Sequence, residues 1–221
     1  MATYLEVLMT AFVNHDATLQ GGMRDFDDSS LVRSYLAGEE RAFSELVRRY
    51  EKRLQNFVFR ATGDTSRAED LVQETFLRVV RHLHRFDHTK KFSTWIYHIA
   101  SNLAKNELRN RSRDPVVLFQ RLEDNKRDDE RQIQFVDPKG DADRLLKLHE
   151  HQDLISQAVR VMPVHHKEVF ILREMADYTY EDIAVITQAE LGTVKSRLNR
   201  AREAFKAAIQ QMGFDYIEGP L

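Results

Sequence analysis

Apolar residues recur every three or four positions along most of the chain, which is the spacing of amphipathic α-helices. The first such run lies within residues 1–24, where we expect one amphipathic helix that ends near Gly21 and Gly22. This helix would pack on the neighbouring domain or else serve as an arm that binds a partner. Strand-like alternation is rare, and the chain has only eight glycines and four prolines. The pattern therefore predicts an all-α fold.

Residues 27–63 predict two further helices. Asp28 or Ser29 can cap the first, which stops at Gly38. The second runs from about residue 39 to Gly63 and has a long apolar side. We expect that side to bury Ala42, Phe43, Leu46, Val47, Tyr50, Leu54, Phe57 and Val58. With the two helices that follow, these elements form a compact helical domain over residues 25–113.

The next two predicted helices, Ala68–Leu83 and Thr94–Asn110, are joined by a short polar turn, with Ser93 as the N-cap of the second. The first has a buried stripe at helical spacing and another face that its own folding does not explain. This acidic face consists of Asp70, Gln73, Glu74 and Leu77. Like charges four residues apart destabilise a helix by about 0.2–0.5 kcal/mol, which a Glu74–Arg78 pair would offset. A solvated face and a binding surface are both open interpretations.

The second helix of this pair has an apolar side and, at 100° per residue, another sector without any acid, because Glu107 points toward the apolar side. This sector, the Trp95–Arg113 stripe, consists of Trp95, His98, Asn102, Lys105, Asn106, Arg109 and Arg113. Cations can meet phosphates, an aromatic ring can stack on a base, and amides can bond to base edges. The stripe suits a nucleic acid, while a solvated face with Trp95 at the edge of the core stays open.

Residues 114–147 change in character. Pro115 and Pro138 interrupt regular structure, and Leu122–Gln132 is dense in charge with little to bury. Nine acids face seven bases across the segment. We expect a flexible, mildly acidic linker, partly disordered, that lets two domains sit far apart.

Residues 148–211 predict a second helical unit. After two helices, Thr179 and Asp182 form a capping box for a short helix. A turn at Thr187–Ala189 then leads into a longer helix, Glu190–Ile209. A short helix, a turn of three to four residues and a longer helix form the helix-turn-helix pattern.

The longer helix has an inward side, which begins with Leu191, and an outer face rich in cations. The outer face consists of Thr193, Lys195, Ser196, Arg197, Asn199, Arg200 and Arg202. Residues 190–206 contain five basic and two acidic side chains, a local charge of +3 on a chain whose net charge is -2. A local positive surface on a nearly neutral protein favours a DNA-reading helix, with a packed helical pair as the alternative.

With 221 residues, 31% charged and 42% apolar, the chain should fold as one large or two small soluble domains. The absence of cysteine excludes disulfides and thiolate zinc sites and fits a reducing compartment. No apolar run approaches the roughly 20 residues that span a bilayer. The N-terminus lacks the pattern of a signal peptide, so we expect a cytoplasmic protein.

Histidines cluster at residues 82–88 and 149–151, which raises the alternative of a metal-dependent enzyme. However, the sequence contains no HExxH motif, glycine-rich phosphate loop or nucleophile elbow. Surface histidines are the simpler interpretation. We therefore expect no metal, no cofactor and no catalytic residue.

Three segments, in this order and at suitable separation, resemble the extracytoplasmic-function (ECF) sigma factors of bacterial RNA polymerase, a compact group of the sigma-70 superfamily. The segments are AEDLVQETFLRVVRHL (68–83), FSTWIYHIASNLAKNELR (92–109) and LGTVKSRLNRARE (191–203). The resemblance covers residues 28–113 and 148–210. It implies two helical domains, sigma regions 2 and 4, joined by a linker, and a function in promoter-specific initiation of transcription.

The resemblance also implies roles for the surfaces of region 2. The acidic face resembles the part that docks on the clamp helices of the polymerase β′ subunit. The Trp95–Arg113 stripe resembles the positions that melt the promoter −10 element and hold its non-template strand. The turn before it resembles a loop that receives a flipped base, which must offset an unstacking cost of a few kcal/mol. That turn adds Phe86, Asp87, His88, Phe92 and Ser93 to the expected −10 site.

For region 4, Glu190–Arg202 resembles the helix that enters the major groove at the −35 element. The implied partners are core RNA polymerase, through the β′ clamp helices and the β flap, and promoter DNA. The family is often held inactive by an anti-sigma protein, but the sequence identifies none. Gln188 replaces the glycine usual in the turn, which must therefore form without an easy left-handed residue. The segments 1–24 and 212–221 are extra to the family pattern.

A helix-turn-helix regulator that acts without replacing the sigma subunit is the nearest alternative. It accounts for residues 148–210 but leaves the Trp95–Arg113 stripe and the acidic face without a purpose. Binding to single-stranded −10 DNA distinguishes the two hypotheses.

Overall fold

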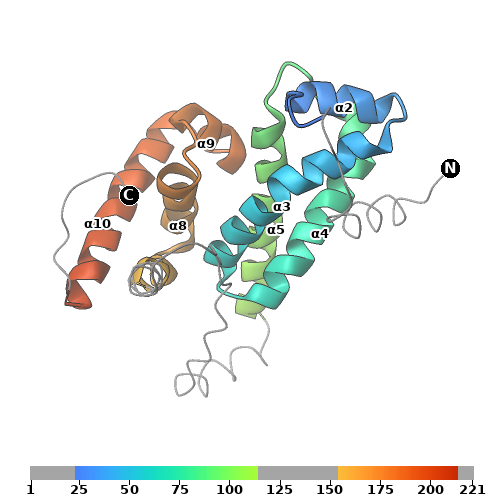
Figure 1. Ribbon diagram of the computed structural model, residues 1–221. Coiled ribbons are helices and arrows are strands. Elements are labelled where there is room, and N and C mark those ends of the chain that lie inside the picture. Colours follow the sequence, from blue (N-terminus) through green and yellow to red (C-terminus); the bar gives the residue numbers. More distant parts are fainter. Residues whose placement is uncertain (1–22, 114–153, 214–221) are drawn as a thin grey trace, which may run out of the picture.

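The described part of the computed structural model comprises residues 23–113 and 154–213, and every regular element in it is a helix (Figure 1). The helices form two units, one from each range. The predicted all-α fold with two small helical domains is confirmed for this part of the chain. The helix predicted at 1–24, the linker at 114–147 and the tail at 212–221 fall almost wholly outside the described residues.

The first unit is built around a long helix, α3 (Glu40–Thr62), with an apolar side along its length. Helix α3 packs against α2 (Asp28–Leu36), α4 (Thr65–His82) and α5 (Phe92–Arg113), and a short 3-10 helix, η2 (Leu83–Arg85), follows α4. All eight residues expected along the apolar side of α3 are buried. Hydrophobic spacing alone therefore located this core.

Helix boundaries follow local chemistry, with a correction of one residue at the start of α2. The carboxylate of Asp27, rather than the side chain of Asp28 or Ser29, accepts the backbone N–H of Ser30 at 2.6 Å and caps the helix. At the end of α3, Gly63 has a φ of 75° in the left-handed region. Glycine adopts this conformation without a Cβ clash, so the helix ends where the sequence predicted.

A polar cluster fixes α2 on α3. Arg49 donates hydrogen bonds to Glu45 at 2.8 Å and to Asp28 at 3.0 Å, and the hydroxyl of Tyr50 donates to the same Asp28 carboxylate. Burial by itself would raise the pKa of the Glu45 carboxyl, but hydrogen bonds from two arginines hold the pKa below its usual range. Because the Asp28 carboxylate accepts hydrogen bonds from side chains of α3, the preceding residue, Asp27, caps α2.

Helix α5 begins earlier and ends later than predicted, at Phe92 and Arg113 rather than Thr94 and Asn110. The backbone N–H of the fourth residue of the helix already bonds to the carbonyl of Lys91 at 3.2 Å. The predicted cap, Ser93, therefore lies inside the first turn. The first residue of the helix is a phenylalanine that is 2% exposed, and burial of this ring decides the start over the local capping signal.

The second unit is a smaller helical bundle. It comprises, in order, the helical residues 154–160, α8 (Val164–Phe170), a π-helical turn η4 (Ile171–Met175), α9 (Tyr180–Thr187) and α10 (Leu191–Gln211). The rings of Phe170 and Phe205 stack at 4.8 Å and join α8 to α10. The π-helical turn, which the sequence pattern did not predict, extends α8 as far as Met175, and residues 176–179 then lead into α9.

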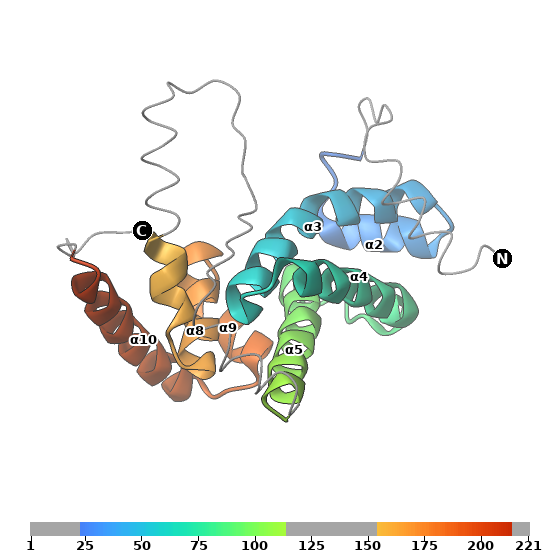
Figure 2. The same cartoon turned by 90° about the horizontal axis from the view of Figure 1, so that it is seen from below.

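The two units are in contact, although the predicted linker would let them sit far apart. Helix α9 lies between α10 and α5 (Figures 1 and 2), and α8 packs against α3. The rings of Tyr97 and Tyr178 meet across this contact at 5.0 Å. We call the contact between the two units the seam.

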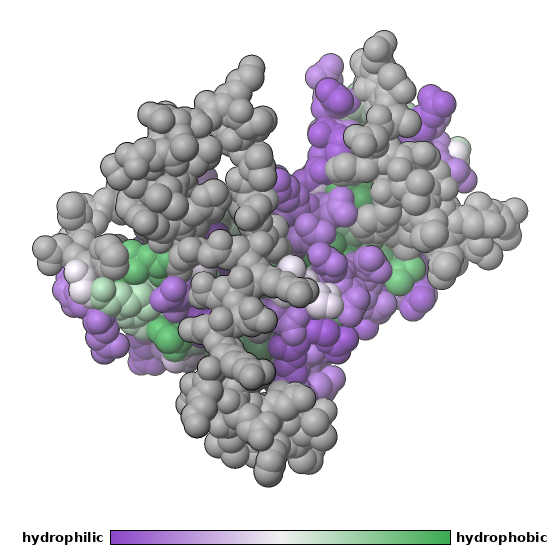
Figure 3. Space-filling model, turned by 60° about the horizontal axis from the view of Figure 1, so that its bottom comes forward, coloured by the Kyte–Doolittle hydropathy of each residue, from purple (hydrophilic) through white to green (hydrophobic). Residues whose placement is uncertain are grey.

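On the face that Figure 3 shows, the coloured atoms are mainly hydrophilic, with separate hydrophobic areas between them. The exposed large apolar side chains of the described residues are Phe26, Leu36, Val161, Val164, Val185 and Leu191. Single exposed apolar residues of this kind are normal on soluble folds. In the two described ranges, no helix is long and apolar enough to cross a membrane.

Candidate polymerase and nucleic-acid interfaces

The acidic face lies along α4, turned away from the core. Asp70 and Gln73 are exposed, whereas Glu74 and Leu77 are partly buried. Arg78 donates to Glu74 at 2.7 Å, as expected, and the side chain of Arg67 adds a weaker contact to Asp70 at 3.4 Å. These pairs offset the repulsion between the two carboxylates without hiding them, because the Asp70 and Glu74 side chains stay 61% and 40% exposed.

A charged network behind the acidic face joins α4 to α5. Glu107 is 9% exposed and points toward the core side, as predicted. It accepts two hydrogen bonds from Arg67, both at 3.0 Å, and one from Arg111 at 2.9 Å. Burial would raise the pKa of the Glu107 carboxyl, but the two guanidinium groups hold it below its usual range. The sequence pattern does not indicate the Arg67–Glu107 pair or the further pair between Arg111 and Asp64, because these partners lie 40 and 47 residues apart.

An aromatic cluster supports the N-terminal end of the Trp95–Arg113 stripe, which lies on α5 and is called the α5 stripe from here on. Trp95 is partly buried, and its ring lies 5.1 Å from that of Phe86 and 5.9 Å from that of Phe92. Phe86 and Phe92, both predicted as −10 site residues, are buried beneath this surface. They fix the indole in place rather than form the outer surface themselves. Trp95 thus lies at the edge of the core, with its ring partly exposed to solvent.

The turn between η2 and α5 is shaped by one aspartate. The carboxylate of Asp87 accepts hydrogen bonds from the backbone N–H of Thr89 at 2.9 Å and from its hydroxyl at 2.7 Å. These bonds lower the pKa of the Asp87 carboxyl. His88, also predicted in the site, is exposed at the same turn and packs edge-on to the ring of Phe86. Asp87 therefore fixes the shape of the loop by bonding to Thr89, a residue that the sequence pattern did not indicate.

The structure divides the α5 stripe into an open half and a covered half. Its C-terminal members Asn106, Arg109 and Arg113 are exposed, and Arg109 donates to Asn106 at 2.8 Å. The preceding members His98 and Lys105 contact the second unit instead. Three members of the stripe are thus free, and two belong to the seam.

The helix-turn-helix forms as predicted, including its unusual turn. The hydroxyl of Thr179 accepts the backbone N–H of Asp182 at 3.1 Å and caps α9. Gln188 ends α9 with a φ of 54° and a ψ of 42°, which is the left-handed conformation that a glycine would adopt more easily. Glu190 then caps α10 through its backbone only, since no side-chain hydrogen bond forms there.

The outer face of α10 is largely accessible. Lys195, Ser196, Asn199 and Arg200 are exposed, whereas Thr193 and Arg197 are partly buried. In residues 154–213 the structure shows no ion pair to the side chains of Lys195, Arg197 or Arg200. Because no carboxylate neutralises them there, these three cations form an anion-binding surface at the N-terminal half of this helix.

Two predicted positions of α10 differ from the others. Arg202 donates two hydrogen bonds to one carboxylate oxygen of Glu174, at 2.9 and 2.7 Å, so it anchors α10 to the π-helical turn. Leu191, expected on the inward side, is instead 37% exposed, because it is the first residue of the helix and has no preceding turn to pack under. The remaining predicted inward residues of α10 are buried.

One histidine near this surface was not named from the sequence. Burial, followed by the charges of Arg200 and Arg197, lowers the pKa of His166 on α8. A neutral imidazole beside two guanidinium groups adds no further repulsion to the cationic surface. In the described residues, no group of three or more side chains is arranged to hold a metal ion.

Two family models match the chain. The model of sigma-70 region 2 matches residues 46–114, and the model of sigma-70 region 4 matches residues 152–205. The first match contains the acidic face and the α5 stripe, and the second contains the helix-turn-helix. The chain therefore belongs to the sigma-70 family, as a two-domain protein of regions 2 and 4.

Its relatives place it in the ECF group of that family. The chain is 33% identical over 193 residues to the RNA polymerase sigma-H factor of Pseudomonas aeruginosa, across 84% of this chain and 95% of the relative. It is 32% identical over 187 residues to the ECF RNA polymerase sigma-E factor of Haemophilus influenzae, across 84% and 96%. A helix-turn-helix regulator that leaves sigma in place is not favoured, because the similarity extends through region 2.

Two solved structures share the fold. The sigma factor RpoE of Bartonella quintana, in complex with the anti-sigma factor NepR, superposes with a TM-score of 0.60 at 22% identity, covering 77% of this chain and 98% of that one. CnrH, in complex with the cytosolic domain of CnrY, superposes with a TM-score of 0.59 at 20% identity, covering 83% and 97%.

Proposed function

We propose that this chain binds core RNA polymerase through the acidic face of α4, and that region 4 adds a contact to the β flap. The observation that carries the proposal is a separation of charge by helix. The carboxylates of Asp70 and Glu74 stay exposed on one face of α4, whereas exposed cations without an ion pair in the described residues, such as Arg109 and Arg200, lie on the proposed DNA-binding surfaces of α5 and α10. Opposite charges on different helices allow one protein to contact a basic protein surface and DNA at the same time.

Promoter DNA would contact the cationic helices in two forms. The α5 stripe would hold the single-stranded −10 element, with Trp95 stacking on a base and Arg109 meeting phosphates. The outer face of α10 would enter the major groove of the −35 duplex, where arginine bonds to guanine edges. Arg197 and Arg200 are the strongest candidates, since neither is engaged in an ion pair within the described residues.

The proposed organisation follows the two matched regions. Residues 25–113 act as region 2, residues 148–211 act as region 4, and residues 114–147 link them. The segments 1–24 and 212–221 are regulatory additions. The chain acts in the cytoplasm by binding alone, without a cofactor, and an anti-sigma protein holds it inactive, as both structural neighbours were solved with a bound protein.

The direct test is run-off transcription with purified bacterial core polymerase, this chain and a library of genomic promoters. We expect transcripts that start at a defined set of promoters sharing −35 and −10 elements. Core polymerase without the chain is the control. Failure to direct any start site, with chain free of bound inhibitors, would reject the proposed function.

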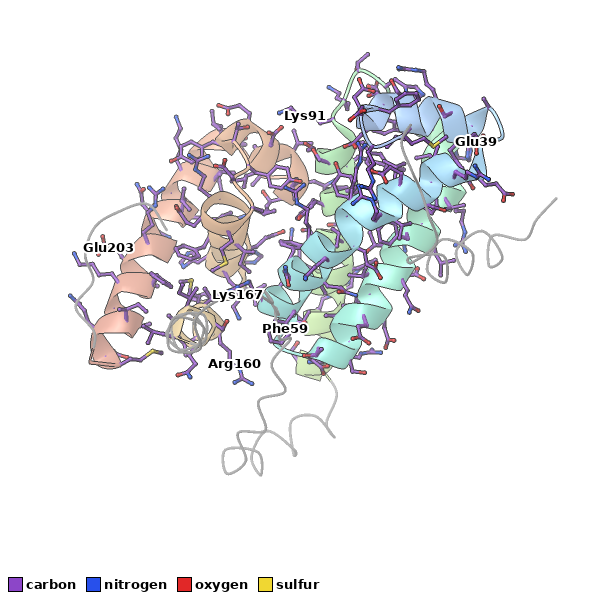
Figure 4. The ribbon with its side chains drawn as sticks, in the orientation of Figure 1. Glu39, Phe59, Lys91, Arg160, Lys167 and Glu203 are labelled. Carbon is purple, nitrogen blue, oxygen red and sulfur yellow. The ribbon has the colours of Figure 1, made fainter. Side chains whose placement is uncertain are left out.

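The docking surface is tested by the charge reversal Asp70→Lys/Glu74→Lys. Because both side chains are exposed and lose only ion pairs on their own helix, folding should change little. Binding to core polymerase should fall by at least about tenfold, as like charges then face a basic partner surface. The control is Glu39→Lys/Glu203→Lys, the same change in net charge at two exposed positions far apart in Figure 4. Equal binding by both variants would rule out the acidic face.

A further inference from the structure

Three side chains of region 2 form a line along the seam. Lys91, His98 and Lys105 are spaced seven residues apart, which is close to two turns of a helix. All three contact region 4, at successive levels along α5. Figure 4 shows Lys91 at the upper end of the seam. The three contacts therefore form one continuous interface between the two units.

At the upper level, a carboxylate of region 4 neutralises a cation of region 2. Lys91 donates to the two oxygens of Asp182 at 2.8 and 3.2 Å, and the hydroxyl of Thr94 lies 3.4 Å from the same group. The Asp182 side chain is only 16% exposed. Burial would raise the pKa of this carboxyl, but hydrogen bonds led by that from Lys91 hold the pKa below its usual range. The contact therefore contains a charged carboxylate at neutral pH.

At the lower level the arrangement repeats with Glu168 of α8. Lys105 approaches one carboxylate oxygen of Glu168 at 2.9 Å, and the hydroxyl of Ser101 donates to the same oxygen. Glu168 is buried, and its second oxygen has no hydrogen-bond partner in the described structure. A buried carboxylate that loses its cation would be costly, so the pair ties α8 to α5.

Between these levels, the imidazole of His98 bridges the units. Its Nδ1–H donates to the backbone carbonyl of Ile186 at 2.9 Å, at the end of α9. Its Nε2 accepts from Asn102 at 3.0 Å and from Gln188 at 3.4 Å. His98, a member of the α5 stripe, is thus occupied by the helix-turn-helix, and Asn102 bonds to the same imidazole from within α5.

From this geometry we propose that region 4 is an internal competitor of the −10 strand. Asp182 and Glu168 take the places that DNA phosphates would take on Lys91 and Lys105, so the chain must open before region 2 can hold the strand. This inference rests on the proposed function of the α5 stripe. Asp182 and Glu168 then have a regulatory role, which is separate from the reading of DNA by the helix-turn-helix.

The competition is specific to one of the two DNA surfaces. Asn106, Arg109 and Arg113 stay exposed beyond the seam, and Lys195 and Arg200 on the outer face of α10 are exposed as well. The closed chain should therefore bind a −35 duplex as well as an opened one does, while it binds a −10 single strand poorly. A general loss of DNA binding would have a different cause.

The test opens the seam from the region 4 side, using the full chain. The variant Asp182→Asn/Glu168→Gln removes both charges and keeps the shape of each side chain and the capping role of position 182. The control is Asp177→Asn/Glu181→Gln, which removes the same two charges from exposed positions of region 4. Both variants gain the same net charge, so a non-specific gain in DNA affinity is matched.

Two readouts separate opening from DNA binding. Because the chain contains no cysteine, the pair Glu39→Cys/Glu203→Cys can carry a donor and an acceptor dye on the two units (Figure 4). The second readout is fluorescence anisotropy of a labelled single strand bearing the −10 sequence of a promoter that the chain initiates from. A labelled −35 duplex from the same promoter serves as the reference ligand.

We expect Asp182→Asn/Glu168→Gln to lower energy transfer and to bind the single strand about tenfold tighter than wild type, since affinity scales with the fraction of open chain. The control variant should match wild type, and affinity for the −35 duplex should not change. Unchanged energy transfer, or lower transfer with unchanged strand affinity, would overturn the competitor role. If the proposed function itself is wrong, neither wild type nor any variant will direct initiation by core polymerase. That result differs from the two outcomes that overturn the competitor role.

Discussion

The charged network behind the acidic face gives the sharpest stability prediction. Replacing Glu107 with Gln removes the charge that pairs with Arg67 and Arg111 across α4 and α5. A hydrogen bond to a charged group contributes about 1.5–3 kcal/mol, but Arg67 is half-exposed and regains water, and Arg111 keeps Asp64 at 2.6 Å. We therefore expect the free energy of unfolding of region 2 to fall by about 1–2 kcal/mol.

The chain is well suited to this measurement, since its single tryptophan, Trp95, lies on α5. Urea unfolding followed by tryptophan fluorescence therefore reports on region 2. With a slope of about 1–3 kcal/mol per molar urea, the midpoint should fall by roughly 0.3–2 M. The control is Glu69→Gln, an exposed position on α4, where we expect a change within about 0.5 kcal/mol. If both variants unfold at the same urea concentration, the network does not hold the two helices together.

The same pair of proteins predicts a pH dependence. The pKa of Glu107 is lowered in the folded protein from its ordinary value of 4.5, so the folded state binds this proton more weakly than the unfolded state. The stability from the network is therefore complete above pH 4.5 and is lost as the pH falls through the lowered folded pKa. The difference between wild type and Glu107→Gln should shrink below about pH 4.5. A constant difference across this range would contradict the assignment.

Two further predictions concern region 4. Gln188→Gly should melt at a higher temperature than Gln188→Ala, by a free-energy difference of about 1 kcal/mol, because position 188 is left-handed and alanine clashes there; equal melting temperatures would contradict this. Arg200→Ala should weaken binding to a −35 duplex by roughly tenfold and should lower the slope of log affinity against log salt concentration by about one. Arg202→Ala should weaken this binding less, because Glu174 already holds the Arg202 side chain. Equal losses, measured by anisotropy at several salt concentrations, would refute the separate role of Arg200.

Much of the local structure was predictable because its causes are local. The spacing of apolar residues located the buried side of α3, and a capping box marked the start of α9 at Thr179. The left-handed turn at Gln188 follows from the same helix-turn-helix pattern even without glycine. The predicted start of α5 failed, because a buried ring at Phe92 outweighs the capping preference of Ser93.

The sequence by itself determined the helices, the family and the three surfaces on α4, α5 and α10, since these depend on spacing within one helix. Only the tertiary structure decided which part of each surface is free. Arg202 is taken up by Glu174, and Lys91 is taken up by Asp182, 91 residues further along the chain. Pairing across such separations depends on how the packed units bring side chains together, and no periodicity in the sequence records it.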